Sequence, residues 1–369
     1  MAGGVRMGLS ARLRSASGEY VTYLPPSPLR LRLDAAALVA NWHMLDAASA
    51  NAACGAAVKA DGYGLGARGV VTRLSEAGCR DFFVSNWAEA KAIADLGATV
   101  SVLHGVRSED MGLAKSGIAR PVLNTARQVQ RWREAGGGLC DVMVDTGMNR
   151  LGLSIEEARS GLLDGLAIDA LMSHLACADE PHPLNRLQLN RFALVRERVK
   201  ARRYSLANSA GILLGNDYAF DLTRPGLALY GGVPSPAGDG RIRQVVFPEA
   251  QVIQRRRVSA GETVGYNANW TAPADTELAV LNIGYADGYL RGFSGVGMAR
   301  LGDAALPVRG RVSMDLLIVD VSATPTLSEG DWVGLDYDLL SASARSGLSQ
   351  YELLTGLSAR FDRRWGALV

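Results

Sequence analysis

The chain has 369 residues, of which 48% are hydrophobic and 21% are charged, as is typical of a globular protein of about two domains. Its 39 basic and 37 acidic residues leave a net charge of +2, which excludes the strongly basic surface of a nucleic-acid-binding protein. No apolar run approaches the ~18 residues that a membrane span needs. The four cysteines show no paired spacing, which indicates a reducing compartment, so we predict a cytoplasmic protein.

The N-terminal segment 1–28 is predicted to be an extension that precedes the folded domains. Residues 1–19 contain arginines but not the apolar stretch of a signal peptide, so we expect a flexible extension and no signal peptide. The prolines of Leu24–Pro28 predict a stiff connector. Leu29–Leu33 alternates apolar and basic residues as a half-exposed strand does, and Asp34 is placed to cap the helix that follows.

Strand-like and helix-like segments then alternate, and several of the helix-like stretches end at a glycine. About eight such repeats in roughly 200 residues predict a (β/α)8 barrel over residues 29–240, and an open doubly wound sheet is the alternative. The expected barrel strands are Cys54–Val58, Asp81–Ser85, Val100–His104, Arg120–Leu123, Cys140–Val144, Asp169–Ser173, Tyr204–Ala207 and Asp221–Arg224.

The pattern changes after Gly240, where strand-like segments follow one another without long helices between them. Turn sequences such as Ala286–Gly288 and Glu329–Asp331 separate them. We therefore predict a second, mainly β domain over residues 241–369. Its expected strands are Val245–Arg257, Glu277–Ile283, Leu306–Val312 and Leu316–Val321.

Lys59 stands where the first expected barrel strand ends, in the sequence AVKADGYGLG (Ala57–Gly66). Three glycines follow it before an apolar pattern of helical spacing resumes at Ala67. Strand ends of an α/β barrel carry the chemistry, and a partly desolvated lysine there can form a Schiff base with an aldehyde. A surface lysine with a buried stem is the ordinary alternative for a lysine considered alone.

Two loops near the end of the expected barrel have the features of a phosphate site. Asn208–Gly211 follows the seventh expected strand, and Arg224–Gly226 follows the eighth. Loops at these positions of α/β barrels commonly bind phosphate, Ser209 offers a hydroxyl, and Gly226 lets the backbone approach a ligand closely. Together with a lysine at the first strand end, this site indicates a phosphorylated aldehyde cofactor, namely pyridoxal phosphate.

From about Leu29 to Trp365 the chain resembles the alanine racemases, pyridoxal-phosphate enzymes of fold type III with an N-terminal (β/α)8 barrel and a C-terminal β domain. The motifs that carry the resemblance are long and therefore specific. They are AVKADGYGLG, DTGMNRLG (Asp145–Gly152), SHLACADE (Ser173–Glu180), NSAG (Asn208–Gly211), RPGLALYG (Arg224–Gly231), VGYNANW (Val264–Trp270), IGYADGY (Ile283–Tyr289) and GRVSMD (Gly310–Asp315).

The resemblance assigns a role to each matching residue. It implies that Lys59 binds the cofactor aldehyde, that Arg224 faces the pyridine nitrogen, and that His174 lies between the cofactor ring and a second base. That base is Tyr266, which in this family comes from the partner subunit of a homodimer. The remaining cofactor-binding residues are Tyr63, Arg150, Asn208, Ser209, Gly226, Leu227 and Tyr351, and the substrate-binding residues are Arg150, Met314 (through its backbone) and Tyr285 at the entrance.

These residue types suit racemisation, which removes the Cα proton on one face and returns a proton on the other. The resemblance implies that Lys59 serves the D-isomer and Tyr266 the L-isomer, so that L- and D-alanine interconvert and D-alanine is supplied for peptidoglycan. A phenol with a pKa near ~10 needs positive neighbours to ionise at neutral pH, and we expect His174 and Arg224 to provide them. Arg224 has only donors, so the facing ring nitrogen should stay unprotonated, which disfavours transamination and decarboxylation.

The chain departs from the family pattern at two positions. Many members read Lys-x-Asp-Thr-Gly-Met-x-Arg, with a lysine that is often carbamylated and holds the arginine in place. Here that position is Met143, so we predict that Arg150 loses this anionic partner and that a bound anion, an acceptor side chain or water replaces it. The second departure is Leu316, where an amide often follows Met-Asp.

Two alternatives to an alanine racemase remain open. One is a racemase of different or broader substrate range, such as serine, which the altered support of Arg150 favours. The other is a non-catalytic cofactor-binding protein, against which the β domain with Tyr266 argues. We expect no metal site, and we predict structural or solvating roles for the other polar residues considered, namely His43, His104, His182, Asp179 and Glu180.

Overall fold

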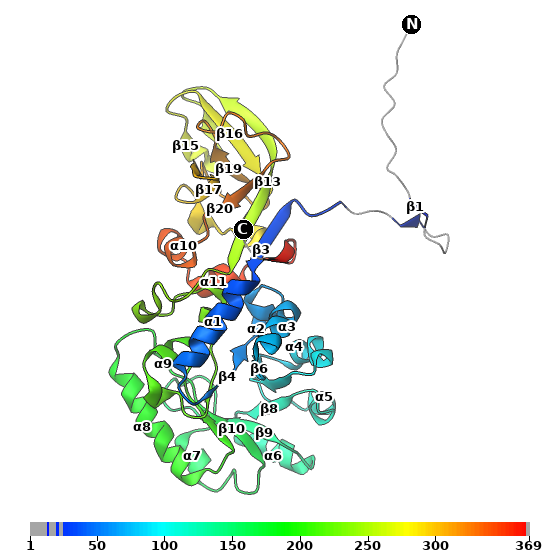
Figure 1. The fold of residues 1–369 in the computed structure, drawn as a ribbon, viewed down its shortest axis with the longest axis vertical. Coiled ribbons are helices and arrows are strands. Elements are labelled where there is room, and N and C mark those ends of the chain that lie inside the picture. The colour runs from blue at the N-terminus through cyan, green and yellow to red at the C-terminus, as the bar shows by residue number, and fades with distance from the viewer. Residues whose placement is uncertain (1–12, 15–19, 22–24, 367–369) are drawn as a thin grey trace.

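A parallel barrel forms one end of the molecule and a mainly β domain forms the other (Figure 1). The computed structural model describes residues 13–14, 20–21 and 25–366. The extension predicted for residues 1–28 therefore lies mostly outside the described residues, although the short strands β1 (Leu13–Arg14) and β2 (Tyr20–Val21) pair with each other. Within the described part of the chain, no helix is long and apolar enough to cross a membrane.

The barrel follows the predicted repeat, and its closure excludes the open sheet. Seven parallel strands lie in chain order, and β12 (Leu222–Thr223) pairs with β4 (Ala53–Cys54) to return the sheet to its start. Backbone hydrogen bonds from Asp221 to Tyr204 (3.0 Å) and from Arg224 to Ala207 (2.9 Å) join β12 to β11. The seven strands are β5 (Ala56–Ala57), β6 (Asp81–Val84), β7 (Thr99–Val102), β8 (Arg120–Leu123), β9 (Cys140–Met143), β10 (Ile168–Met172) and β11 (Arg203–Ser205).

The first strand differs from its prediction, because the expected Cys54–Val58 is two short strands that flank Gly55. The chain divides its pairing here: β4 pairs with β12, whereas β5 pairs with β6. Gly55 is required at the crossing, since a Cβ there would lie 2.8 Å from the Asp81 carbonyl oxygen and 2.9 Å from the Phe83 ring. Several other strands end one or two residues before their predicted ends, because the chain leaves the sheet where the loops of the candidate site begin.

Most of the helices around the barrel begin at side-chain caps, and each buries part of its surface. Asp34 accepts a hydrogen bond from the Ala37 backbone, as predicted, and Asn86, Thr125 and Ser154 cap later helices in the same way. These helices are α1 (Ala35–Ala48), α3 (Ala67–Ala77), α4 (Trp87–Ala92), α5 (Met111–Lys115), α6 (Ala126–Glu134), α7 (Ile155–Arg159), α8 (Pro183–Arg198) and α9 (Ser209–Leu213).

A cluster of charged side chains ties strands β6, β8, β10 and β11 together. Arg203 forms ion pairs with Asp81 (2.8 Å) and with Asp169 (2.6 Å), and Arg120 pairs with Asp169 (2.8 Å). Asp141 is fully buried beside them, and burial raises the pKa of its carboxyl. Because a buried charge is costly without a partner, this cluster favours one arrangement of the strands.

The second domain is built on β13 (Val246–Val258), which alternates buried and more exposed residues over its first half. β13 pairs with β16 (Thr276–Leu281) and β20 (Trp332–Leu335), and β16 pairs in turn with β19 (Leu317–Asp320). The other elements are β14 (Thr263–Val264), β15 (Trp270–Thr271), β17 (Met298–Leu301), β18 (Ala304–Pro307), α10 (Leu339–Ser346), α11 (Gln350–Thr355) and β21 (Asp362–Gly366).

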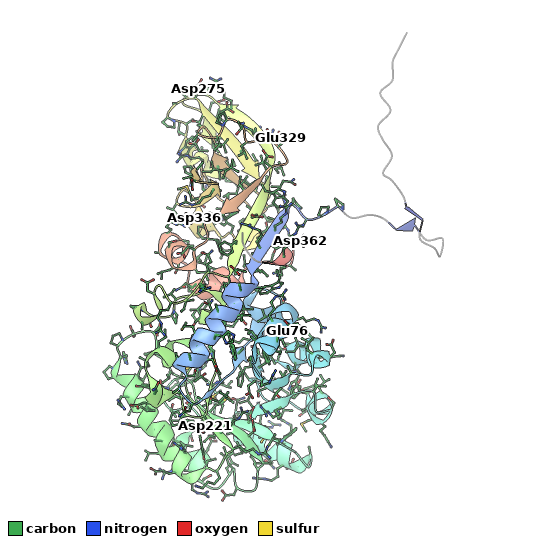
Figure 2. The ribbon with its side chains drawn as sticks, in the orientation of Figure 1. Glu76, Asp221, Asp275, Glu329, Asp336 and Asp362 are labelled. Atoms are coloured by element: carbon green, nitrogen blue, oxygen red, sulfur yellow. The ribbon has the colours of Figure 1, made fainter. Side chains whose placement is uncertain are left out.

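β3 (Leu29–Asp34) belongs to the sheet of this second domain, although the sequence placed residues 29–240 in the barrel domain. It pairs antiparallel with β13 and parallel with β21. The predicted alternation is present, with Leu29, Leu31 and Leu33 buried. The chain thus begins in the β domain, and α1 carries it into the barrel (Figure 1). Figure 2 shows charged side chains distributed over both domains.

Candidate active site

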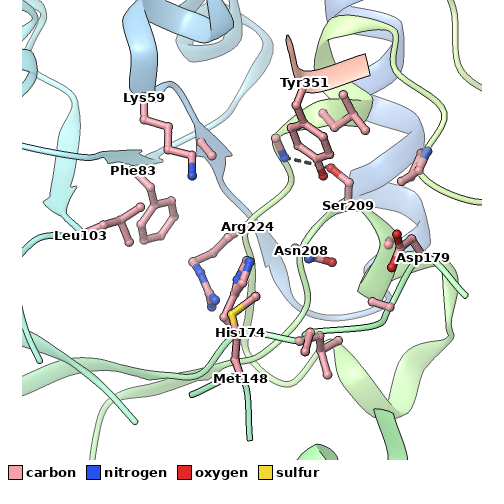
Figure 3. Close-up of a pocket in the computed structure, with 18 of the residues that line it drawn as sticks. Lys59, Phe83, Leu103, Met148, His174, Asp179, Asn208, Ser209, Arg224 and Tyr351 are labelled. Carbon is pink, nitrogen blue, oxygen red and sulfur yellow. Dashed lines mark hydrogen bonds between the residues drawn. The ribbon is translucent and has the colours of Figure 1, made fainter. Parts of the chain in front are cut away.

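A cavity of about 960 Å³ lies at the carboxyl ends of the barrel strands. This volume is at the upper end of what small-molecule sites have. Figure 3 shows side chains converging on it from several strand ends and from α11 of the second domain. All ten residues expected to bind a cofactor line it: Lys59, Tyr63, Arg150, His174, Asn208, Ser209, Arg224, Gly226, Leu227 and Tyr351.

Lys59 lies two residues after the end of β5 and begins a tight turn, and its amine points into the cavity (Figure 3). Burial lowers the pKa of the Lys59 amine, the nearby Arg150 guanidinium lowers it further, and Glu89 opposes both effects. The lowered pKa increases the fraction of neutral amine, which is the form that attacks an aldehyde. The location and environment of Lys59 therefore fit a lysine that forms a Schiff base better than they fit a surface lysine with a buried stem.

The predicted phosphate end is assembled around Gly226. The Ser209 hydroxyl accepts hydrogen bonds from the backbone N–H groups of Gly226 (2.9 Å) and Ala228 (3.2 Å), and Asn208 caps α9. A Cβ on residue 226 would lie 2.2 Å from the Tyr63 hydroxyl, so glycine alone leaves room for that group. Tyr351 reaches the same end from α11 (Figure 3). Three hydroxyls and backbone N–H groups in one place fit a phosphate.

Arg224 lies buried behind His174 and is fixed by two acceptors, the Ser205 hydroxyl and the Ser173 carbonyl. Burial lowers the pKa of Arg224 to about 10, so its guanidinium remains charged at neutral pH. Burial, followed by the charges of Arg224, Arg150 and Lys59, lowers the pKa of His174 to about 3. The neutral form of His174 is therefore favoured at neutral pH, and of the two residues expected to bring positive charge to the second base, Arg224 is the one whose pKa keeps it charged.

Arg150 follows a loop that Asp145 organises: the Asp145 carboxylate accepts hydrogen bonds from the backbone N–H groups of Gly147 (2.8 Å), Met148 (2.9 Å) and Arg150 (2.8 Å). The Arg150 guanidinium has no hydrogen-bond or ion-pair partner among the described side chains. Of the replacements that we considered for the missing carbamate, an acceptor side chain is therefore not observed in the described residues. Met143 lines the cavity wall at this point.

Three predicted site residues, Tyr266, Met314 and Tyr285, lie outside the cavity of the single chain. Tyr266 is 65% exposed and Met314 is 54% exposed, whereas Tyr285 is partly buried in the second domain. Tyr266 begins the short helix η5 (Tyr266–Ala268) between β14 and β15, and β15 lies at the end of the molecule away from the barrel (Figure 1). The chain alone therefore does not bring a second base to Lys59.

The structure adds residues that the sequence did not single out. Phe83 and Leu103 form one wall of the cavity, and the Arg224 guanidinium lies 6.0 Å from the centre of the Phe83 ring. Both residues fall in segments predicted as barrel strands, but every residue of β6 is buried, so no alternation revealed which side chains face the site. Tyr230, in the RPGLALYG motif, stacks on Tyr63, and the centres of the two rings are 4.6 Å apart.

The loop before α8 also differs from its prediction. Asp179, for which we expected only solvation, lines the cavity. Cys177, Glu180 and His182 place potential ligand atoms within 4.8 Å of one another. However, His182 Nδ1 already accepts a hydrogen bond from the Leu184 backbone (3.1 Å) and caps α8. His182 thus has a structural role, as predicted, because it caps α8.

Comparisons with known proteins agree with this geometry. The family "Alanine racemase, N-terminal domain" matches residues 33–234, and "Alanine racemase, C-terminal domain" matches residues 245–365. The alanine racemase of Methylobacterium nodulans is 41% identical over 359 residues, which cover 91% of this chain and 95% of that protein. The catabolic alanine racemase of Agrobacterium fabrum is 43% identical over 357 residues, 91% of each chain. The structure of alanine racemase from Bartonella henselae with covalently bound pyridoxal phosphate superposes with a TM-score of 0.85 at 34% identity, covering 92% of this chain and 100% of that one.

Proposed function

This chain belongs to the alanine racemase family, and we propose that it interconverts L-alanine and D-alanine with pyridoxal phosphate bound at Lys59. The observation that carries the proposal is the convergence in one cavity of Lys59, a phosphate-sized cradle at Gly226 and the donor-only Arg224. The related Bartonella henselae enzyme, whose structure contains this cofactor covalently bound, supports the same assignment.

The residues of the cavity fit the cofactor from end to end. Lys59 would hold its aldehyde carbon, and Arg224 would face its ring nitrogen. Its phosphate would be held by the hydroxyls of Tyr63, Ser209 and Tyr351 and by the backbones of Gly226 and Leu227. When bound, pyridoxal phosphate supplies an electron-withdrawing ring that acidifies the Cα–H bond of an attached amino acid.

Proton exchange then requires one group on each face of the substrate. The Lys59 amine would exchange the proton of D-alanine, and the hydroxyl of Tyr266 from the partner subunit would exchange that of L-alanine. The exposure of Tyr266 supports this arrangement, because a side chain destined for a neighbouring subunit's cavity must project from its own chain. Arg150 and the Met314 backbone would receive the substrate carboxylate, and Tyr285 would line the entrance.

The charges of the cavity favour this chemistry. Lys59, Arg150 and Arg224 bring positive charge to a cavity whose proposed occupants carry a phosphate and a carboxylate. Arg224 offers donors but no acceptor, so it stabilises an unprotonated ring nitrogen and limits competing reactions at the cofactor. Because Met143 offers Arg150 no anionic partner, we propose that a bound anion or water holds the Arg150 guanidinium.

We propose further that the enzyme is a cytoplasmic homodimer that supplies D-alanine for peptidoglycan. Enantiomers have equal free energies in water, so the direction of net flux depends on which isomer the cell consumes.

The substrate range is the part of the proposal in which this chain departs from its family. Because Met143 replaces the lysine that supports Arg150 in many members, a broader range that includes serine is the second candidate. Racemisation of a panel of L-amino acids, followed by chiral chromatography, separates the two candidates. Alanine should react fastest, and a serine rate equal to or above it would favour the broader enzyme. Lys59→Ala should abolish all turnover, whereas Lys91→Ala, a change at an exposed position on α4, should not.

A further inference from the structure

The five residues that follow Lys59, 60–64, form a left-handed turn. Ala60, Asp61 and Tyr63 have φ angles of 52°, 51° and 55°, and Gly62 and Gly64 have φ angles of 64° and 85°. The turn is closed by backbone hydrogen bonds from Gly62 to Val58 (2.8 Å) and from Gly64 to Ala60 (2.9 Å). Residues other than glycine adopt this conformation at a cost, so consecutive ones persist only where surrounding contacts hold them.

Glu89 holds the start of this turn. One carboxylate oxygen accepts the Ala60 N–H (2.9 Å), and the other accepts the Ser85 N–H at the end of β6 (2.7 Å). Ala60 is the residue next to Lys59, and its N–H has no acceptor within the turn itself. Glu89 thus fixes the peptide unit that follows the Lys59 α-carbon to the neighbouring barrel strand.

Arg363 holds the end of the same turn from the second domain. Its Nε (2.9 Å) and Nη2 (2.7 Å) both donate to the Gly64 carbonyl. Further bonds to the carbonyls of Leu357 (3.2 Å), Ser358 (3.0 Å) and Phe361 (3.3 Å) fix the guanidinium itself. The fork of an arginine can satisfy this many acceptors, and a lysine ammonium cannot reproduce its geometry.

The second domain packs against the turn closely enough to control its position. A Cβ on residue 64 would lie 2.4 Å from the Leu354 carbonyl oxygen of α11, so the two backbones are in direct contact. The Trp365 indole of β21 packs on Gly69 of α3, where a Cβ would lie 2.6 Å from its ring nitrogen. The end of the chain therefore contacts both the turn and the helix that follows it.

We infer that Arg363 and Glu89 are positioning residues for Lys59, clamping the left-handed turn at both ends and so fixing where the amine meets its ligand. This inference rests on the proposed role of Lys59. The turn connects directly to the Lys59 backbone, so its relaxation swings the amine within the cavity. A displacement of about 1 Å in a reacting group lowers turnover by roughly 10²-fold.

The test compares Arg363→Lys with Arg364→Gln in the full-length holoenzyme and apoprotein. Arg364 is the next residue, is exposed and pairs with Asp362 (2.7 Å), so its variant changes the charge without touching the turn. For Arg363→Lys we expect kcat to fall roughly tenfold or more while KM changes less than about threefold. In the apoprotein, hydrogen exchange at the amides of Gly62, Gly64 and Gly66 should accelerate, while exchange in β13 stays unchanged.

Glu89→Gln should give the same effects to a smaller degree, because its amide retains one acceptor oxygen for two N–H groups. The inference is overturned if Arg363→Lys matches Arg364→Gln in turnover, or if its turn amides exchange faster without any loss of kcat. Arg363→Met removes all the donors, and if it does not fold, the lysine variant still decides. Should Lys59→Ala retain turnover, the proposed function would fail, whereas the exchange data on the apoprotein would still test whether Arg363 holds the turn.

Discussion

Tyr266 is the residue on which the two-sided chemistry depends, and it can be tested with a change of one oxygen atom. Tyr266→Phe should lower L-alanine turnover by about 10²- to 10⁴-fold, because it removes the proposed acid/base group on one face. The visible absorbance of the bound cofactor should persist, since Tyr266 is not among the residues proposed to hold the cofactor. Chiral chromatography and absorption spectroscopy measure the two effects.

Tyr204→Phe serves as the control for this change. The Tyr204 hydroxyl donates to the Val199 carbonyl (3.1 Å), outside the cavity, so this variant should racemise alanine at the normal rate. Unchanged L-alanine turnover in Tyr266→Phe would remove this residue from the mechanism.

His174 should make the apoprotein sensitive to acid. Its pKa is lowered to about 3 in the folded chain, whereas an unfolded histidine has a pKa of ~6.5. As the pH falls through the window from ~6.5 to ~3, the unfolded chain binds a proton that the folded chain does not, so the free energy of unfolding decreases. At pH 4.5 the loss should be roughly 2.7 kcal/mol.

Urea unfolding of the wild type and of His174→Gln, at pH 7.5 and at pH 4.5, measures this contribution. The variant lacks the titrating group, so it should lose less stability than the wild type between the two pH values. Carboxylates also titrate over this range, but they do so in both proteins. Equal losses in the two proteins would show that His174 is not held neutral by its surroundings.

At the level of single residues, the sequence located those site residues that have a distinctive chemistry next to a strand end. Lys59, Ser209 and Arg224 were identifiable in this way, and all three line the cavity. Phe83 and Glu89 were not. Phe83 belongs to a strand buried on both sides, and Glu89 acts on backbone N–H groups that become available only through the left-handed turn.

The loop from β12 into the short helix η3 (Leu227–Tyr230) is the element that shapes the proposed phosphate site. Gly226→Ala would place a Cβ 2.2 Å from the Tyr63 hydroxyl and 2.9 Å from its ring. Tyr63 has little room to retreat, because it stacks on Tyr230, whose hydroxyl donates to the Ala57 carbonyl (2.8 Å). The loop must therefore shift, and the dissociation constant for pyridoxal phosphate should rise about tenfold or more, or ~1.4 kcal/mol.

Titration of the apoprotein with pyridoxal phosphate, followed by absorbance, measures this change. Gly112→Ala on α5 is a suitable control, because a Cβ there meets nothing within 4 Å and the residue has an ordinary φ. If both variants bind the cofactor equally well, the cradle around residue 226 does not hold its phosphate.

Among the elements, local patterns predicted which segments are strands but not always which sheet they join. The alternation of Leu29–Leu33 marked a strand correctly, yet its partners β13 and β21 lie more than 200 residues away in the chain. An alternation of apolar and polar residues identifies a strand, but it does not specify the strand with which it pairs. The same limit explains why Cys54–Val58 was expected as one strand. The strand is interrupted at Gly55 because the residues before it pair with β12 and the residues after it pair with β6.

For the whole molecule, the change from β/α repeats to consecutive strands predicted a barrel followed by a mainly β domain, and the structure has both. The contact between the domains could not be predicted, because it joins backbone groups, such as the Gly64 carbonyl, to a side chain almost 300 residues later. The cavity likewise has all the residues proposed to bind the cofactor in one chain, whereas Tyr266 lies outside it in the second domain. The remaining question at this scale is whether the second base comes from a partner.

Heterodimers of two inactive variants answer this question. In a dimer of Lys59→Ala with Tyr266→Phe, a site shared between subunits would combine the intact Lys59 of one chain with the intact Tyr266 of the other. One of the two sites is then complete, so the heterodimer should have about half the wild-type turnover per dimer. Co-expression with two affinity tags isolates the heterodimer, and each homodimer should be nearly inactive.

The reciprocal heterodimer reverses the expectation and excludes simple subunit rescue. When a wild-type chain pairs with a chain that carries both substitutions, every shared site lacks either Lys59 or Tyr266, so turnover should be near background. If each chain instead used its own Tyr266, this second heterodimer would keep about half the activity, and the first would have none. The two measurements together therefore distinguish a site completed by the partner from one completed within the chain, whatever the strength of the dimer.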